Sequence, residues 1–162
     1  MSALVALANV TLTANASTIT FSSISQSYRD LLFVFNLKST GTDYVQYRVN
    51  GLTSVYGFNL WDGQNTTINA NSTYNTSFGQ IDQNYANVVS GAFNSGSLYM
   101  ADYSATDRRK NTFIKNSNQG GFQLVLNGAR TPATAAVTSI VFSLGTHQFG
   151  TGASIALYGV TA

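Results

Sequence analysis

The side chains that could perform acid–base or nucleophilic chemistry are few in this chain. Its 162 residues include a single histidine, His147, six aspartates, no cysteine and no glutamate. One imidazole cannot supply the two or three histidine ligands of a catalytic zinc site, and without cysteine there is no thiol nucleophile and no disulfide. A Ser-His-Asp triad would have to use His147, but no G-x-S-x-G turn surrounds any serine. This inventory predicts that the chain is not an enzyme and has no catalytic, metal or cofactor site.

The aspartates have plain local interpretations. Two carboxylates could in principle cleave a glycosidic bond. However, Asp62 and Asp107 fall at predicted turns, Asp43 falls at the start of a predicted strand, and Asp30 lies beside Arg29. The first of these is followed by glycine, and this pair is more typical of a turn than of a calcium loop, because the later acidic ligands are missing. The carboxylates are therefore expected to be structural.

Aromatic side chains could instead bind a partner. They are frequent between residues 44 and 85, among many Asn, Ser and Thr residues, and rigid aromatics with small polar neighbours are typical of binding surfaces and suit a sugar. The candidate contacts are Tyr56, Trp61 and Tyr74, although Tyr56 and Trp61 could equally fill the core. Phe58 and Phe78 are expected in the core.

A second candidate contact is the basic triplet Arg108, Arg109 and Lys110. Its plainer interpretation is a solvated turn. The formal net charge is only +2, from eight basic and six acidic residues, whereas binding to nucleic acid requires clustered Lys and Arg. We therefore expect no nucleic-acid partner.

Composition indicates the elements that must position these residues. Charged residues make up 9% of the chain, far below the usual ~25%. The abundant Ser, Thr and Asn compete for backbone hydrogen bonds within a helix, and the strong helix former Glu is absent. Thr, Val, Ile, Tyr and Phe suit a pleated sheet, and the 14 glycines fit many tight turns. The composition predicts an all-β protein.

Alternation of apolar and polar residues predicts the individual strands. It is clearest in residues 18–21, 31–37, 44–49, 52–61, 97–103, 112–116, 122–127, 137–144 and 154–160. Residues 64–87 are polar and Asn-rich, and predict a long excursion with one or two short strands. These segments predict an antiparallel two-sheet sandwich of jelly-roll type, with roughly nine or ten strands and no substantial helix.

Two local features make sharper predictions. The pair Asn50-Gly51 is a strong hairpin signal between residues 44–49 and 52–61, because both residues tolerate a positive φ. In residues 31–37, Leu32 and Val34 are apolar like their alternating neighbours. Apolar residues on both faces predict a central strand that is covered on both sides.

The chain shows no sign of division into several domains. No charged or proline-rich linker interrupts it, so residues 17–162 are expected to form a single β-sandwich domain. Residues 1–16 are uncharged and are expected to form an N-terminal arm or an edge strand. They lack the basic region of a signal peptide, and no apolar run reaches the ~18 residues of a membrane helix. We therefore expect no membrane partner.

Four segments resemble a known group of proteins. Residues 16–31 read ASTITFSSISQSYRDL, which is similar to the STITFSSI-x-Q-x-Y-x-DL opening of small structural proteins of tailed bacteriophages. Residues 137–142, VTSIVF, and 152–160, GASIALYGV, resemble the ITSI and GSxIxLYGI closing strands of that group. Residues 47–51, YRVNG, resemble its IRFNG hairpin. Ser25 departs from the pattern, which usually has proline, and residues 60–110 carry no shared motif.

This resemblance implies a β-sandwich virion protein without a catalytic site. The resemblance leaves the location in the particle open. The short, self-contained β domain with its uncharged arm favours a capsid decoration, or cement, protein on the outer capsid surface: a homotrimer that bridges subunits of the major capsid protein or other virion proteins. An uncharged arm at residues 1–16 could add a strand to a neighbour's sheet. A tail location remains open, as a tail-fibre or receptor-binding tip domain that recognises bacterial surface glycan through the aromatic middle of the chain. A cellular carbohydrate-binding module is a third alternative.

Overall fold

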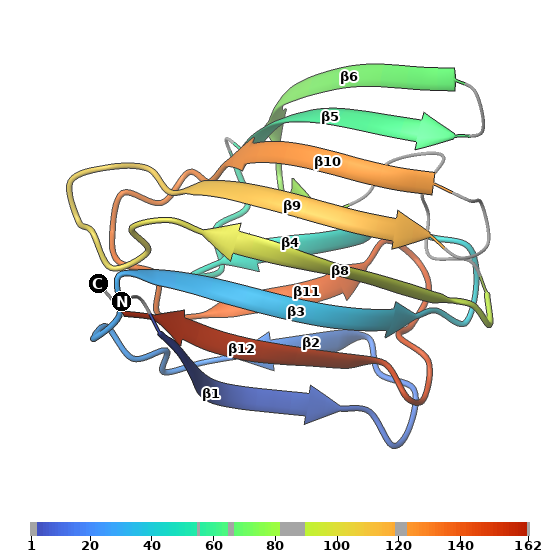
Figure 1. The fold of residues 1–162 in the computed structure, drawn as a ribbon, viewed down its shortest axis with the longest axis horizontal. Helices are drawn as coiled ribbons and strands as arrows, with labels where there is room; N and C mark the ends of the chain where they lie inside the picture. Colours follow the sequence, from blue (N-terminus) through green and yellow to red (C-terminus); the bar gives the residue numbers. More distant parts are fainter. Residues whose placement is uncertain (1–2, 55, 65–66, 82–89, 119–122, 162) are drawn as a thin grey trace.

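The computed structural model describes residues 3–54, 56–64, 67–81, 90–118 and 123–161. These residues form twelve β-strands and no helix, and the strands make two antiparallel sheets that pack face to face (Figure 1). The predicted all-β sandwich is therefore confirmed, with more strands than the roughly nine or ten expected. No helix that could cross a membrane occurs within the described ranges.

The larger sheet has eight strands and the smaller sheet has four. In spatial order the larger sheet contains β1 (Leu4–Thr11), β12 (Ser154–Val160), β3 (Asp30–Lys38), β8 (Phe93–Met100), β9 (Asn111–Asn118), β10 (Gln123–Arg130), β5 (Tyr56–Gln64) and β6 (Thr67–Thr76). The smaller sheet contains β2 (Thr18–Phe21), β11 (Ile140–Leu144), β4 (Val45–Val49) and β7 (Gly79–Gln80).

The strand order identifies a jelly roll with two added hairpins. When β5, β6, β9 and β10 are set aside, the two sheets read first-eighth-third-sixth and second-seventh-fourth-fifth in chain order. This is the order of two interlocked Greek keys. The hairpins β5–β6 and β9–β10 then continue the larger sheet beyond β8 (Figure 1). We call the eight strands that remain after the hairpins are set aside the jelly-roll body, and we call the two hairpins the extension.

The main core lies between the two sheets of the jelly-roll body. Alternate residues of β2, β3 and β11 point into it, as the period of two predicts. Phe33 of β3 packs edge-to-face on Phe21 and Phe142, with ring centroids 5.6 and 5.4 Å apart. The extension contributes a separate, smaller cluster of Phe58, Leu60, Val125 and Ala129. The expectation that Phe58 lies in a core is confirmed, whereas Phe78 is only half-buried.

The turn predicted at Asn50-Gly51 is confirmed, but the predicted pairing of the two strands that flank it is wrong. Both residues have the expected positive φ, 50° and 69°, and the N–H of Leu52 donates to the Val49 carbonyl. However, β4 pairs with β11 and β7, and the return strand β5 joins the other sheet. The turn chemistry fixes the local reversal, but it does not determine which strand pairs with β4.

Two segments with the composition of turns are instead parts of strands. Asp62 and Gly63 lie within β5, and Asp62 is buried. Gly128 lies within β10. Glycine signals a turn in sequence because it tolerates unusual φ values, but these two glycines adopt ordinary strand geometry. The long excursion predicted for residues 64–87 contains the ten-residue strand β6 and the short β7. Its residues 82–87, which include Asp82 and Tyr85, lie outside the described residues.

Residues 4–11 form an edge strand of the larger sheet. β1 pairs antiparallel with β12 from Leu4 to Thr11, with one register shift between Ala6 and Ala8. Leu7 and Val10 pack against the main core. This segment is therefore tied to its own domain along one side, while its other side ends the sheet (Figure 1).

Candidate functional site

The face of the larger sheet that points away from the smaller sheet is exposed and largely apolar. We call it the outer face. Val34 lies on it and is 43% exposed, so the prediction that β3 is covered on both sides is wrong. Only one side of the sheet meets the smaller sheet, and eight strands are too many for four strands to cover. The exposed apolar residues of the outer face are Val34, Trp61, Ile68, Tyr74, Phe113, Leu124 and Leu126.

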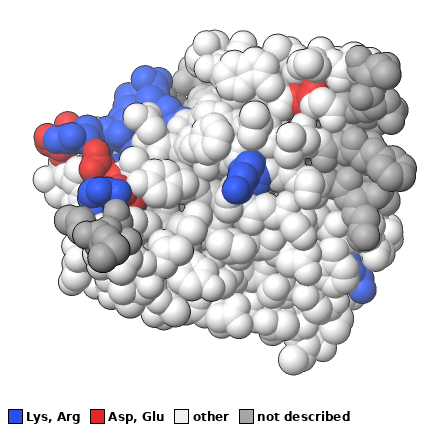
Figure 2. All heavy atoms as spheres, in the orientation of Figure 1, with Lys and Arg blue, Asp and Glu red and all other residues white. Residues whose placement is uncertain are grey.

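The outer face carries little charge. Figure 2 shows an isolated cation near its middle, a cluster of charged side chains towards the end of the sheet where β8 is followed by β9, and isolated acidic and basic atoms at the opposite end. The register places Lys115 of β9 on this face, between Ser97 of β8 and Leu126 of β10. An apolar, charge-depleted surface with aromatic residues is typical of the core of a protein interface and of a sugar-binding platform.

Depressions on the outer face offer places for a ligand. One, of about 410 Å³, lies over β10 and β5 beside Tyr74, and we call it the Tyr74 hollow. Another, of about 470 Å³, lies between Val34 and Leu124 with Lys115 in its lining. A smaller one, of about 190 Å³, lies beside Trp61. The first two fall within the ~300–1,000 Å³ range of small-ligand sites.

Two of the predicted aromatic contacts lie on the outer face. Trp61 is 51% exposed on β5, and Tyr74 is 72% exposed on β6. They belong to one hairpin, where Trp61 lies opposite Ala70 and Tyr74 lies opposite Gly57. The small partners leave both rings open to solvent, so the structure brings these two residues to one surface.

Tyr56 is not available to a partner, which corrects its prediction as a contact. Its side chain is 1% exposed and packs edge-to-face on Tyr47, with ring centroids 6.1 Å apart. Its hydroxyl accepts the N–H of Val49 and donates to the carbonyl of Leu52. Burial raises the pKa of this phenol. Tyr56 therefore fixes the end of β4 and the turn that follows it.

Lys110 is likewise buried, which splits the basic triplet. Its ammonium donates to the carbonyl oxygens of Ala105, Arg108 and Thr134 at 2.6–2.9 Å, and burial lowers its pKa. It joins the connection between β8 and β9 to the connection that follows β10, and its prediction as a contact is wrong. Arg109 is exposed.

Arg108 is also exposed, but it is already paired. Its guanidinium lies 2.8 Å from Asp107 and 3.7 Å from Asp102. The pKa of Asp107 lies below its usual value because of the hydrogen bond from Arg108. An exposed pair of this kind contributes little to stability. The two arginines lie at the charged end of the sheet, away from Trp61.

The single histidine takes part in a structural network. His147 Nδ1 lies 3.2 Å from Asp43 Oδ2 and 3.0 Å from the hydroxyl of Thr146. Asp43 also accepts the backbone N–H groups of Tyr44, Thr146 and His147. Burial alone would raise the pKa of Asp43, but these donors outweigh it and hold the pKa below its ordinary value. The pair pins the residues after β11 to the start of β4. Among the described residues, no group of three or more metal-binding side chains is found.

Asp30 has a similar structural role at the start of β3. It is ion-paired with Arg29, with Nε and Oδ2 2.6 Å apart, and it accepts the Tyr99 hydroxyl and the N–H of Asp102. Burial would raise its pKa, but the bonds from Tyr99, Asp102 and Arg29 lower it overall. This carboxylate ties the loop after β8 to β3.

Sequence reasoning missed most of the outer face. Val34, Phe113, Leu124 and Leu126 were not predicted as contacts. For Val34 the reason is that apolar residues on both sides of residues 31–37 indicated a doubly covered strand. The signal was present in the run Leu124-Val125-Leu126, which places apolar side chains on both faces of β10. The outermost strands of a wide sheet can leave such residues uncovered.

Comparisons with known proteins add little. No family model and no curated protein matches the chain. Among solved structures, the marine PL-14 alginate lyase from Aplysia kurodai is similar at 12% identity, over 86% of this chain and 72% of that one, with a TM-score of 0.36. Backbones that differ this much assign no activity to this chain.

Proposed function

We propose that this protein is a non-enzymatic structural component of a tailed-bacteriophage particle: a capsid decoration protein that attaches by adding its β1 edge to a strand of a capsid subunit. The observation that carries this proposal is the free, uncharged edge of β1. In this account the protein acts as a homotrimer on the outer capsid surface, where symmetry multiplies individually weak contacts.

The β1 edge lacks the side chains that normally prevent strand addition. Edge strands are usually protected by charged residues, above all Lys, or by proline. β1 has neither in its eight residues, and its first two residues, Leu4 and Val5, are exposed. Its one irregularity is the register shift between Ala6 and Ala8. Backbone hydrogen bonds to a partner strand need no charge on either side, which suits a surface this poor in Lys, Arg and Asp.

The segments that resemble phage structural proteins are neighbours in the fold, which supports their use as a unit. β2 pairs with β11 from Thr18 to Phe21, and β3 pairs with β12 from Asp30 to Asn36. The opening and closing motifs thus meet in both sheets of the jelly-roll body, and the extension carries none of them. A body that carries the resembling motifs and an extension that carries none fit a particle protein whose attachment and exposed surface are separate parts.

Co-sedimentation with capsids assembled without this chain tests the proposal. Leu4→Lys combined with Asn9→Lys places two charges along the β1 edge and is expected to reduce capsid binding at least tenfold. Ile68→Lys is the matched control, because Ile68 is 82% exposed on β6, the opposite edge of the same sheet. Its binding is expected to be unchanged. Equal binding by the double variant and the wild type would refute attachment through β1.

A second candidate function is recognition of bacterial surface glycan by a tail-associated domain. The observation that favours it is the pair of exposed aromatics on one hairpin, Trp61 and Tyr74, beside exposed Asn59. Aromatic faces with neighbouring amides suit the apolar and hydroxyl sides of a sugar. Binding to a glycan array that is lost in Trp61→Ala, with the fold intact by circular dichroism, would support it. An array without any bound glycan would count against it.

A further inference from the structure

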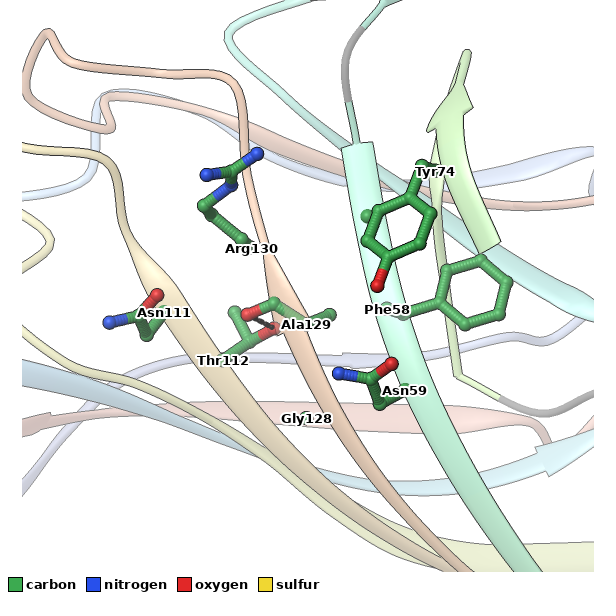
Figure 3. Close-up of a pocket in the computed structure, with 9 residues that line it drawn as sticks. Phe58, Asn59, Tyr74, Asn111, Thr112, Gly128, Ala129 and Arg130 are labelled. Carbon is green, nitrogen blue, oxygen red and sulfur yellow. Dashed lines mark hydrogen bonds between the residues drawn. The ribbon is translucent and has the colours of Figure 1, made fainter. Parts of the chain in front are cut away.

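Two strand glycines, Gly57 and Gly128, line the Tyr74 hollow and form its floor. Figure 3 labels Gly128. Gly57 of β5 lies opposite Arg130 of β10. Gly128 of β10 lies opposite Asn59 of β5, so the two glycines are diagonal neighbours. A Cβ atom at Gly128 would meet no heavy atom within 4 Å, so packing does not require glycine there. Glycine weakens a strand, and within strands it often marks the point where a ligand approaches the backbone.

Polar side chains without a partner surround this floor. Arg130 and Asn111 lie on one side of the hollow, and Tyr74 and Asn59 lie on the other (Figure 3). All four are exposed. Across the described residues, none of these side chains forms a hydrogen bond or an ion pair, unlike Arg29 and Arg108, which pair with aspartates. Two amides, one guanidinium and one phenol ring therefore line one depression, and no described residue pairs with any of them.

We propose that the Tyr74 hollow binds a single sugar residue that carries a carboxylate, such as a uronic acid unit of an acidic surface polysaccharide. The planar guanidinium of Arg130 can hold a carboxylate with two hydrogen bonds. The ring of Tyr74 offers a face for the apolar side of a pyranose, and the amides of Asn59 and Asn111 can both donate to and accept from hydroxyls. This inference rests on the glycan-recognition function and does not require attachment to a capsid.

The chain offers a matched pair of variants for the test. Gly128→Val extends a side chain into the hollow from a Cβ that meets no heavy atom within 4 Å, and valine suits a strand. Gly63→Val is its control, because a Cβ at Gly63 also meets nothing within 4 Å and Gly63 points to the outer face of β5 outside the hollow. Arg130→Gln removes the charge and keeps a polar side chain. The probes are glucuronate, galacturonate and N-acetylneuraminate, with glucose and galactose as neutral counterparts, titrated up to about 50 mM against the ¹⁵N-labelled protein by NMR.

At least one acidic sugar is expected to shift the amides of residues 57–59, 74, 111 and 128–130, with a Kd at least tenfold below that of its neutral counterpart. Gly128→Val should abolish these shifts, Gly63→Val should keep them, and Arg130→Gln should remove the tenfold preference. Equal binding of neutral and acidic sugars at the hollow would overturn the inference and leave glycan recognition standing. No shift with any sugar, or shifts that persist in Gly128→Val, would overturn the site itself. Gly128→Val is expected to co-sediment with capsids as the wild type does. The test of the sugar site and the test of capsid attachment therefore have independent outcomes.

Discussion

The jelly-roll body and the extension belong to one continuous sheet, but they are built differently. The body encloses a large core with edge-to-face rings such as Phe21, Phe33 and Phe142. Its buried aspartates, Asp30 and Asp43, both accept several hydrogen bonds. The extension adds Tyr56 and Ile114 to that core, and otherwise it has a four-residue cluster beneath it. Above that cluster it exposes most of the apolar residues of the outer face, from Trp61 to Leu126.

This difference separates stability from binding. The body contains the residues whose removal leaves a cavity or an unpaired group, which are the changes that cost most. The extension presents exposed rings, glycines and amides that contribute little to folding. A surface of this kind can change without loss of the fold, which suits recognition of a partner. Substitutions matched between the two regions can test this division.

The largest difference is expected for the same substitution in the two cores. Phe142→Ala should lower the free energy of unfolding by about 3–5 kcal/mol, the usual cost of removing a buried phenylalanine ring. Phe58→Ala should lower the free energy of unfolding by less, because Phe58 belongs to the small cluster and its few neighbours can relax into the space that the ring leaves. Urea denaturation of both variants measures the difference. An equal or larger loss for Phe58→Ala would show that the extension is not the weaker region.

The junction between the two regions provides the next effect. Lys110→Ala removes the ammonium that bonds three carbonyl groups in the connections around β9 and β10. We expect a loss of about 2 kcal/mol or more, since one hydrogen bond to a charged group contributes about 1.5–3 kcal/mol. Arg109→Ala, one residue away and exposed, should change the free energy by less than about 0.5 kcal/mol. Similar values for both variants, measured by urea denaturation, would contradict the structural role of Lys110.

The carboxylates of the body predict how stability depends on pH. The pKa values of Asp43 and Asp30 are lowered in the folded protein. Their contribution is therefore complete above the unfolded pKa of about 3.9 and is lost as the pH falls through the lower folded pKa. Asp43→Asn should destabilise the protein by about 2 kcal/mol at pH 7, because it weakens charged hydrogen bonds. The difference from wild type should shrink towards pH 2, and a difference that grows on acidification would contradict this assignment.

The smallest effect on stability is expected on the outer face. Val34→Ser and Trp61→Ser should each change the free energy of unfolding by less than about 0.5 kcal/mol, because both side chains are already exposed. Thermal melts of the two variants check this expectation. A loss above about 1 kcal/mol would show that these side chains support the sheet and would weaken the division between the two regions.

The sequence was most informative where alternation is strict and one face is buried. It located β2 and β12 to the residue, and it separated the two faces of β3, although only one of them is covered. It failed where pairing is long-range, as at Asn50-Gly51, because a turn motif carries no information about which strand becomes the neighbour. It also failed where glycine lies within a strand, as at Gly63 and Gly128.

The candidate site was harder to predict than the fold. Trp61 and Tyr74 were identified from their residue types, but Tyr56 and Lys110 were not recognisable as buried, because burial of a polar side chain depends on partners far away in sequence. Arg130 and Asn59 carried no signal at all. Only the register of β10 with β5 brings them together around the glycines.

Electron cryomicroscopy of the phage particle to which we propose this protein belongs would test the central claim most directly. The account predicts density for the jelly-roll body on the outer capsid surface, in trimers, with the β1 edge against a strand of the capsid subunit and the extension pointing outward. Density restricted to the tail would instead support the glycan-recognition function. Absence of the protein from the particle would contradict the account.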